Sequence, residues 1–205
     1  MVKLAVLVSG GGTNLQAVLD AKAAGKIPSG EIALVVSGRE DAYALTRAKT
    51  AGVPACVVKK TRAMAPEEYG ERLLSVLREN AIGFVVLAGF LTILPANFIK
   101  AYEGRIINVH PSLIPSFCGA GYYGLKVHEA ALAYGVKVTG ATVHYVNEIP
   151  DGGRIIAQKA VAVLQGDTPE TLQRRVMEEA EWQLLPRAVE ECCLQLEKAG
   201  EGMPT

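Results

Sequence analysis

Short apolar runs alternate with amphipathic stretches along the first half of the chain. The runs predict strands and helices by turns, over residues 4–8, 15–24, 32–37, 41–51, 55–58, 66–80 and 83–90. Strands that stay apolar throughout are typical of a parallel sheet with both faces covered, because each face is then buried under helices. The alternation therefore predicts successive strand–helix–strand units with right-handed crossovers.

The pattern changes after residue 115. Residues 127–134 predict a short helix, and the strand-like runs 136–146 and 154–163 are joined by so short a connection that we expect an antiparallel hairpin. A long helical pattern then starts at Thr168-Pro169, ends near residues 198–200, and is expected to be kinked or split by Pro186. The predicted fold class is α/β: a Rossmann-like, mostly parallel twisted sheet flanked by helices, with an antiparallel hairpin in the C-terminal part. We expect one domain over residues 1–200 and a disordered tail over 201–205.

One strand-like run, residues 105–110, carries polar side chains that a strand buried on both faces should not have. Alternation places Asn108 and His110 on one face and Val109 on the other, and Pro111 forces the chain out of the sheet directly afterwards. Ligands of open α/β sheets bind outside the carboxyl ends of the strands. The pair is therefore a candidate catalytic group, although a hydrogen-bonded polar pair at a strand end is an equally open reading.

A glycine-rich turn, residues 9–14, follows the first strand and precedes the first helix. Glycines let backbone N–H groups approach an anion closely, and the helix N-terminus adds partial positive charge. The turn lacks the Gly-Lys-Ser/Thr of a nucleotide-triphosphate loop, and Leu15 stands where a dinucleotide fingerprint has its third glycine. A single phosphate is the ligand that remains, with tight packing as the alternative.

The composition of the chain excludes several classes of binding partner. The 205 residues are 50% apolar with a formal net charge of zero, so no general attraction to nucleic acid or to a membrane surface is expected. The apolar start, residues 1–9, is too short for a signal peptide or a membrane span, which favours a cytoplasmic location. Cys56, Cys118, Cys192 and Cys193 show no metal-ligand spacing, so we expect buried thiols and no metal.

Four segments together resemble a known family: Ser9 to Leu15, Val86 to Phe90, Ile107 to Pro115, and Val143 to Val146 followed by Asp151-Gly152-Gly153. They are similar to the phosphoribosylglycinamide formyltransferases, a branch of the folate-dependent formyltransferase superfamily, over nearly the whole chain. Related methionyl-tRNA formyltransferases carry an extra C-terminal domain, and formyltetrahydrofolate hydrolases an N-terminal one. We expect neither here, given the length of the chain.

The resemblance implies transfer of a formyl group from 10-formyltetrahydrofolate to the amine of glycinamide ribonucleotide, in purine biosynthesis. It implies that Asn108, His110 and Asp151 are catalytic. It further implies that Gly12, Thr13 and Asn14 hold the substrate phosphate, that Glu181 contacts the ribonucleotide, and that Leu91, Thr92, Ile93, Leu94, Asn108 and His144 bind the folate with the hairpin loop 147–153. Formyl folate is the only co-substrate expected, and no metal is expected.

The chemistry suits these roles. An amide at Asn108 and a protonated His110 can stabilise the oxygen of a tetrahedral centre. Asp151 would raise the pKa of His110 and take up the proton of the attacking amine. Non-functional interpretations stay open for three of these sites. Asp-Gly-Gly is a common turn sequence, His144 can form its hydrogen bonds within the hairpin, and Glu181 can be a solvated charge on a helix.

The chain also departs from the family. Thr92 and Pro66 stand where some members have arginines near the folate tail, which predicts weaker binding of that tail. The glycine-rich loop 117–124 is longer than in some members, and it is a candidate lid.

Two rival functions remain at this stage. A nicotinamide oxidoreductase would use Arg39, after the second strand, for a 2′-phosphate. A non-enzymatic phosphosugar-binding module would give Asn108, His110 and Asp151 no role. The expected partners are small molecules, without nucleic acid or membrane, and a homodimer is possible.

Overall fold

A computed structural model describes residues 1–200, which contain one seven-stranded sheet in the order β3-β2-β1-β4-β5-β6-β7. The strands are β1 Val2–Val8, β2 Gly30–Ser37, β3 Ala55–Val57, β4 Phe84–Leu87, β5 Ile106–His110, β6 Val138–Tyr145 and β7 Ile155–Ala162. The helices are α1 Thr13–Ala23, α2 Tyr43–Thr50, α3 Pro66–Glu79, α4 Ala96–Ala101, α5 Leu125–Tyr134, α6 Pro169–Val176, a π-helical turn η1 Met177–Glu181, and α7 Trp182–Ala199.

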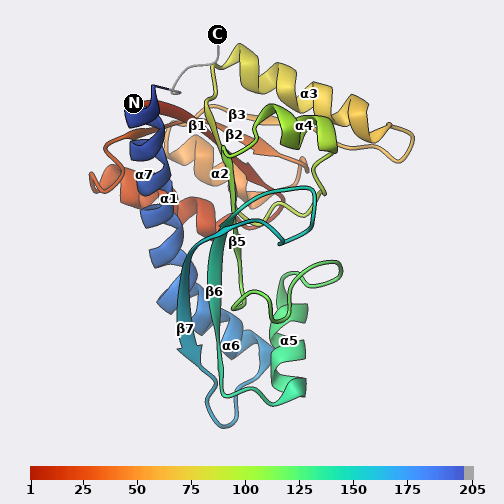
Figure 1. The fold of residues 1–205 in the computed structure, drawn as a ribbon, viewed down its shortest axis with the longest axis vertical. Helices are drawn as coiled ribbons and strands as arrows, with labels where there is room; N and C mark the ends of the chain where they lie inside the picture. The colour runs from red at the N-terminus through yellow and green to blue at the C-terminus, as the bar shows by residue number, and fades with distance from the viewer. Residues whose placement is uncertain (201–205) are drawn as a thin grey trace.

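The sheet has a parallel half and an antiparallel end. Strands β3, β2, β1, β4 and β5 are parallel, whereas β6 runs antiparallel to β5, and β7 antiparallel to β6. Figure 1 shows β6 and β7 extending away from the parallel half, with α5 and α6 beside them. The predicted α/β sheet with its C-terminal hairpin is confirmed.

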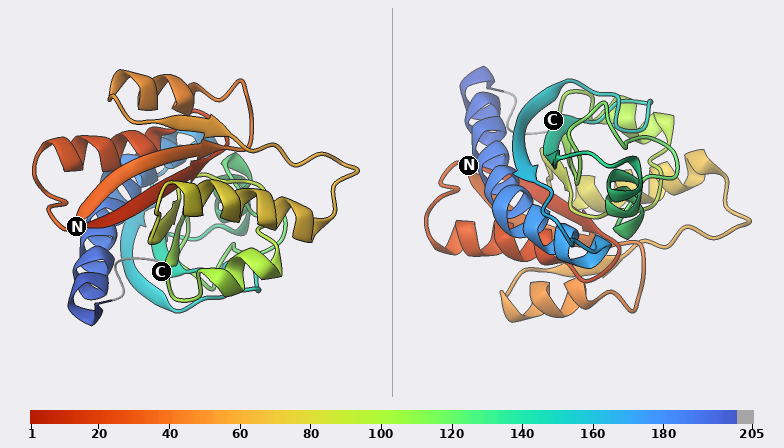
Figure 2. Two further views of the ribbon diagram at one scale, coloured as in Figure 1. Left: turned by 90° about the horizontal axis from the view of Figure 1, so that it is seen from above. Right: turned by 90° about the horizontal axis from the view of Figure 1, so that it is seen from below.

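Helices cover both faces of the sheet, as the unbroken apolar strands require. One buried cluster joins β1 and β2 to α1, α2, α6 and α7, with Leu15, Ala44 and Leu185 among its members. The opposite cluster packs α3 and α4 on the other face through side chains such as Leu73 and Phe98. The end-on views of Figure 2 show the sheet between these two layers.

Two details differ from the sequence prediction. Residues 96–101 form α4, a helix that the proline-containing apolar stretch before β5 concealed. The long C-terminal helix is interrupted at η1, whereas Pro186 lies inside α7. Pro186 is in the second turn of α7, early enough for the helix to continue around it.

The cysteines, the hydropathy of the helices and the end of the chain bear on the remaining expectations. All four cysteines are free; Cys192 and Cys193 are buried as expected, but Cys56 and Cys118 are partly exposed. Within residues 1–200, no helix has both the length and the hydropathy needed to cross a bilayer. The predicted tail, 201–205, lies outside the described residues, and the single domain over 1–200 stays a prediction.

Candidate active site

The structure brings Asn108, His110 and Asp151 together at the carboxyl end of β5. Asp151 Oδ2 lies 3.5 Å from His110 Nδ1, and Asp151 Oδ1 lies 3.5 Å from Asn108 Nδ2. Register explains the meeting, because Asn108 pairs with His144 on β6 and the β6–β7 loop then returns Asp151 over the strand end. An amide, an imidazole and a carboxylate therefore face a single point.

His144 fixes the orientation of the Asn108 amide. Its Nδ1 lies 2.8 Å from the Tyr145 carbonyl oxygen, which can only accept, so Nδ1 carries the hydrogen. In the neutral ring, Nε2 is then an acceptor, and it lies 3.1 Å from Asn108 Nδ2. One N–H of Asn108 is thereby held by His144, while the other faces Asp151 across a long, weak contact.

The loop after Pro111 covers this group. The Phe117 carbonyl oxygen accepts a hydrogen bond from His110 Nε2 at 2.9 Å, and the Gly119 N–H donates to Asp151 Oδ2 at 2.8 Å. The sequence predicted a lid over 117–124 but not these contacts. Backbone groups have no residue-specific signal, so sequence reasoning had no means of finding them.

The charge on His110 differs from the expectation. Burial lowers the pKa of His110, and the Asp151 carboxylate and the Phe117 carbonyl raise it by less, so it lies below its usual value. The predicted effect of Asp151 has the right sign, but burial outweighs it and favours a neutral imidazole at neutral pH. Burial also raises the pKa of Asp151, but the contact with His144 at 3.6 Å, the charge that His110 carries when protonated and the Gly119 hydrogen bond leave it below its ordinary value.

The Asp-Gly-Gly segment needs both of its glycines for space. A Cβ on Gly153 would lie 1.7 Å from the Tyr145 carbonyl oxygen, and one on Gly152 would lie 2.7 Å from the Ile149 side chain. Asp151 itself has a left-handed backbone with φ 55°. The turn is therefore closely packed, and this packing holds Asp151 over the end of β5.

The glycine loop forms a second polar centre at the end of β1. Gly12 precedes α1 with φ 71°, and no side chain caps the first turn of the helix. The N–H groups of that turn are therefore available to an anion, together with the helix dipole. A Cβ on Gly12 would lie 2.6 Å from the Ala44 Cβ, whereas Gly10 and Gly11 have no neighbour within 4 Å of theirs. Gly12 is therefore required for packing against α2, whereas Gly10 and Gly11 leave open space in which an anion can approach the loop.

Glu181 meets this loop from the far end of the chain. Its Oε2 accepts a hydrogen bond from Asn14 Nδ2 at 2.5 Å, and the residue is only 5% exposed. Burial raises the pKa of Glu181 to about 7, although the Asn14 hydrogen bond lowers it somewhat. The reading of Glu181 as a solvated charge is wrong. It ends the π-helical turn η1, a feature often found at functional sites.

The predicted folate segment also lies at the carboxyl edge of the sheet. The Leu91 N–H donates to Ser9 Oγ at 3.0 Å, which ties this segment to the start of the glycine loop. Leu91 and Ile93 are 60% and 74% exposed, and Leu94 is buried. Ile149 of the hairpin loop is also exposed. These side chains offer apolar surface to a ligand, and their role in binding folate stays a prediction.

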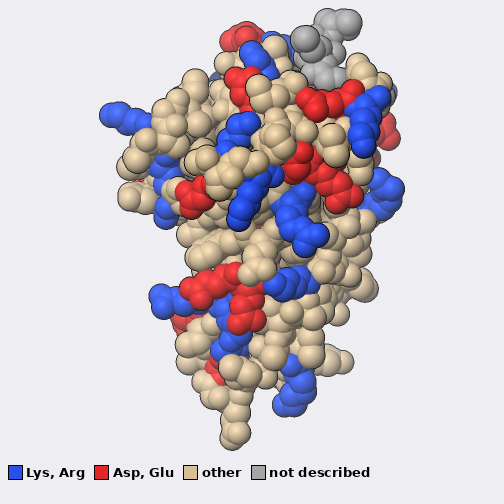
Figure 3. Space-filling view, turned by 90° about the vertical axis from the view of Figure 1, so that its left-hand side faces the viewer, with Lys and Arg blue, Asp and Glu red and all other residues tan. Residues whose placement is uncertain are grey.

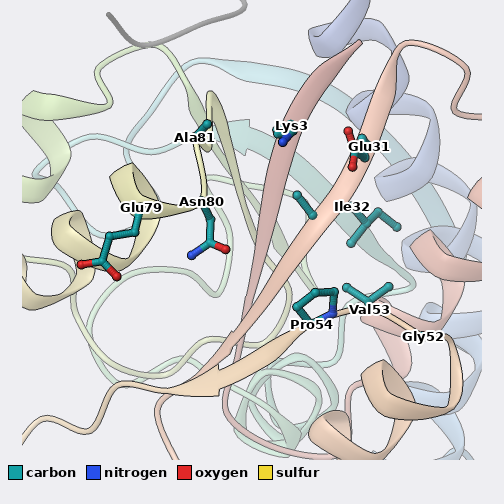
Figure 4. Close-up of a pocket in the computed structure, with 10 residues that line it drawn as sticks. Lys3, Glu31, Ile32, Gly52, Val53, Pro54, Glu79, Asn80 and Ala81 are labelled. Carbon is teal, nitrogen blue, oxygen red and sulfur yellow. The ribbon is translucent and has the colours of Figure 1, made fainter.

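Other features fall outside this group. A cavity of about 430 Å³ lies at the opposite, amino edge of the strands, between Lys3, Glu31 and Asn80, where Figure 4 shows it. His128 on α5 is fully buried, with no hydrogen-bond partner for either ring nitrogen among the described residues. Within residues 1–200 no three His, Cys, Asp or Glu side chains are arranged as metal ligands, and the expectation of a metal-free site stays a prediction.

Comparison with known proteins identifies the family of the chain. A family model described as formyl transferase matches residues 2–189. Phosphoribosylglycinamide formyltransferase of Haemophilus influenzae is 39% identical over 189 residues, covering 92% of this chain and 86% of the relative. The chloroplastic phosphoribosylglycinamide formyltransferase of Arabidopsis thaliana is 41% identical over 182 residues, covering 86% of this chain.

Solved structures give the same result. Glycinamide ribonucleotide transformylase 1 from Symbiobacterium toebii superposes with a TM-score of 0.88 at 41% identity, over 95% of this chain and 89% of that one. Phosphoribosylglycinamide formyltransferase from Bacillus halodurans gives 0.86 at 38% identity, over 96% of both chains. The chain spans 61% of the length of the Arabidopsis relative and 18% of the trifunctional purine biosynthetic protein of Gallus gallus, which is 44% identical. The family match over nearly all of the described fold, with these relatives near 40% identity, shows that the chain belongs to the formyl transferase family.

Proposed function

We propose that this protein transfers the formyl group of 10-formyltetrahydrofolate to the amine of glycinamide ribonucleotide, giving N-formylglycinamide ribonucleotide for purine biosynthesis. One observation supports this most: Asn108, His110 and Asp151 converge at the same sheet edge as an anion cradle that includes a buried carboxyl, Glu181. Relatives near 40% identity have names that describe this reaction. Neither rival function explains both centres.

The ribonucleotide occupies the glycine loop in this proposal. Its phosphate takes the free N–H groups at the start of α1, over Gly12, Thr13 and Asn14, where the helix dipole favours an anion. Glu181 contacts the sugar. Its raised pKa keeps part of the population protonated at pH 7, which limits repulsion between this carboxyl and the phosphate.

The formyl folate approaches from the segment Leu91, Thr92, Ile93 and Leu94, with Asn108, His144 and the hairpin loop on the other side. Exposed apolar side chains at Leu91, Ile93 and Ile149 suit a planar ring system. Thr92 and Pro66 supply no cation for the folate tail, so binding of the tail is expected to be weaker than in relatives with arginines there.

The chemical step is direct attack of the substrate amine on the formyl carbon. The oxygen of the tetrahedral centre gains charge, which Asn108 stabilises through the N–H that now faces Asp151 over 3.5 Å, and His110 through Nε2–H. Asp151 receives the proton of the amine, directly or through water. The intermediate then collapses, the bond from carbon to the folate nitrogen breaks, and that nitrogen takes up the proton that Asp151 received, directly or through water.

Two backbone groups of the loop over the site occupy the hydrogen-bonding positions proposed for the substrates. The Phe117 carbonyl accepts from His110 as the tetrahedral oxygen would, and the Gly119 N–H donates to Asp151 as the amine would. Both contacts have to break before the substrates bind. The loop is therefore proposed to open for entry and to exclude water once it closes again.

The proposal includes the setting of the reaction. The substrates are small molecules, no nucleic acid or membrane takes part, and the enzyme acts in the cytoplasm, as a monomer or a homodimer. The plant relatives are described as chloroplastic, so the compartment differs within the family.

A two-substrate assay tests the proposal. The protein is mixed with 10-formyltetrahydrofolate and glycinamide ribonucleotide, and formylated product and free tetrahydrofolate are measured together. Equal amounts of both are expected, and neither should form at a comparable rate when one substrate is omitted.

The rivals predict different results. A nicotinamide oxidoreductase would show hydride transfer with a nicotinamide cofactor and no dependence on folate. A phosphosugar-binding module would bind the ribonucleotide without turnover. Release of tetrahydrofolate without formylated ribonucleotide would mean that water, not the amine, is the acceptor, and the proposed substrate would be wrong.

A further inference from the structure

A second cavity, of about 680 Å³, lies between α1 and the start of α7. Small side chains of α1, Ala17, Ala21 and Ala24, line one wall, opposite Trp182 and Arg187 of α7. Because alanines face large side chains across this pair of helices, a hollow remains. Its volume falls in the range of small-molecule sites, and the triad Asn108, His110 and Asp151 is not among the residues that line it. Thr13, one of the residues predicted to hold the substrate phosphate, is among them, so the cavity adjoins the glycine loop.

Unpaired cations gather around this cavity. Lys26, Arg47 and Arg187 line it, and none of them forms an ion pair with a carboxylate among residues 1–200. Arg47 is held by neutral acceptors, the Gly11 carbonyl at 2.8 Å and Gln16 Oε1 at 3.0 Å. The single acidic residue in the lining is Asp20, so the local charge is positive. Figure 3 views the side of the molecule that carries α1 and α7, where Lys and Arg side chains gather near the middle with acidic ones around them.

The α7 wall carries an aromatic side chain. Trp182 lines the cavity and is partly exposed. Its indole N–H is buried and has no acceptor among the described residues, so the ring meets the cavity through its other atoms. The exposed part of the ring provides a surface on which a planar base can stack.

We propose that this cavity is a second binding site, for a nucleoside monophosphate. The base would stack on Trp182, and the phosphate would lie among Lys26, Arg47 and Arg187. Guanidinium groups form strong charge-assisted hydrogen bonds with phosphate oxygens, and two of the three cations here are arginines. This inference does not depend on the proposed reaction, because binding alone tests it.

The chain contains a built-in reporter, since Trp182 is its only tryptophan. Full-length protein is titrated with AMP while indole fluorescence is recorded, and equilibrium dialysis with labelled AMP measures binding that leaves fluorescence unchanged. Saturable binding of one AMP to a site that quenches Trp182 is expected. Inorganic phosphate, which lacks the base, should bind at least about tenfold more weakly.

Four variants locate the bound nucleotide. Arg187→Ala should weaken AMP binding by about tenfold, because it removes one charge-assisted contact. Arg174→Ala, an exposed arginine on α6 outside the lining, is the matched control and should leave binding unchanged. Gly11→Ala places a side chain in the glycine loop and tests whether AMP binds there instead. Lys26→Ala repeats the test should Arg187→Ala fail to fold.

Clear results overturn the proposal. No binding by dialysis would do so, as would equal affinity for phosphate and AMP, which would mean that the ring contributes nothing. Binding that Gly11→Ala weakens and neither Arg187→Ala nor Lys26→Ala affects would assign the nucleotide to the glycine loop.

Discussion

The two polar centres at the carboxyl edge of the sheet are built in different ways. At the end of β1, Gly12 packs against Ala44, and the Asn14–Glu181 contact is buried, so the cradle is part of the core. At the end of β5, Asp151 and Phe117 have left-handed backbones, and Asp151 lies 3.5 Å from both Asn108 Nδ2 and His110 Nδ1. The first centre is formed without a ligand, whereas the second is covered by a loop that we propose moves when substrates bind.

Because of this contrast, substitutions at the two centres should affect different properties of the protein. Substitutions in the packed cradle should affect folding as much as binding, because its residues are also core residues. Conservative substitutions of the polar side chains at the covered centre should affect catalysis with little loss of stability, because they keep the shape of the side chain and leave the packed glycines of the turn unchanged.

The largest effect is expected at the covered centre. Asp151→Asn removes the carboxylate but keeps the shape, and Asn tolerates a left-handed backbone well. Loss of the proton acceptor should lower kcat by about 10²- to 10⁴-fold while the thermal midpoint stays close to that of the parent. Steady-state kinetics and a melting curve on the same preparation test this, with Asp41→Asn, in an exposed ion pair with Arg39, as the control. Near-normal kcat would mean that Asp-Gly-Gly is only a turn.

The packed cradle should respond through stability instead. Gly12→Ala puts a Cβ 2.6 Å from that of Ala44 and forces a left-handed alanine, so a loss of about 2–4 kcal/mol in the free energy of unfolding is expected. Denaturant titration measures it. Gly11→Ala, which meets nothing within 4 Å, should leave stability almost unchanged while raising the ribonucleotide KM. Equal stability losses in the two variants would contradict the packing argument.

A smaller catalytic effect should reveal the role of His144. His144→Leu removes the acceptor that holds Asn108, so the amide is free to rotate, and kcat should fall about 10- to 100-fold, less than for loss of an oxyanion donor itself. His144→Gln returns a carbonyl acceptor and should recover part of that loss, with KM for folate little changed. If His144 instead binds folate directly, KM rises and the glutamine variant gives no recovery in kcat.

The smallest effect is expected at Glu181, where one substitution should increase the stability of the protein and weaken its binding of the ribonucleotide. The pKa of Glu181 rises from 4.5 to about 7 in the folded protein. Below pH 4.5 both states are protonated; as the pH rises to 7, the unfolded chain gains by ionising first, and the native state loses stability. Glu181→Gln should therefore stabilise the protein by about 1–3 kcal/mol at pH 8 and by almost nothing at pH 4.5, while the ribonucleotide KM rises about tenfold. A stability gain that is the same at both pH values would show that ionisation of Glu181 is not its cause.

The sequence predicted this sheet because the hydrophobic periods were unambiguous, and it located Asn108 and His110 because polar residues interrupted a buried strand. The meeting of these residues with Asp151 is confirmed, although their catalytic roles remain predictions. Three features had no residue pattern to mark them: the backbone groups of Phe117 and Gly119, the helix α4 next to Pro95, and the extra turn width at η1. The charge on His110 was misjudged because burial depends on the whole fold, whereas the neighbouring carboxylate could be inferred from the motif.

The π-helical turn η1 also sets the rotational phase between α6 and α7. Each residue of an α-helix turns the next by about 100°, so one additional residue within a turn changes which side chain faces inward. Here α6 buries Leu172 and Val176, α7 buries Leu185 and Val189, and Glu181 between them still faces the glycine loop. Deleting one residue of 177–180 would restore a regular helix and rotate α6 relative to Glu181 and α7. The position of the carboxyl group therefore depends on the number of residues in this turn as well as on which residue carries it.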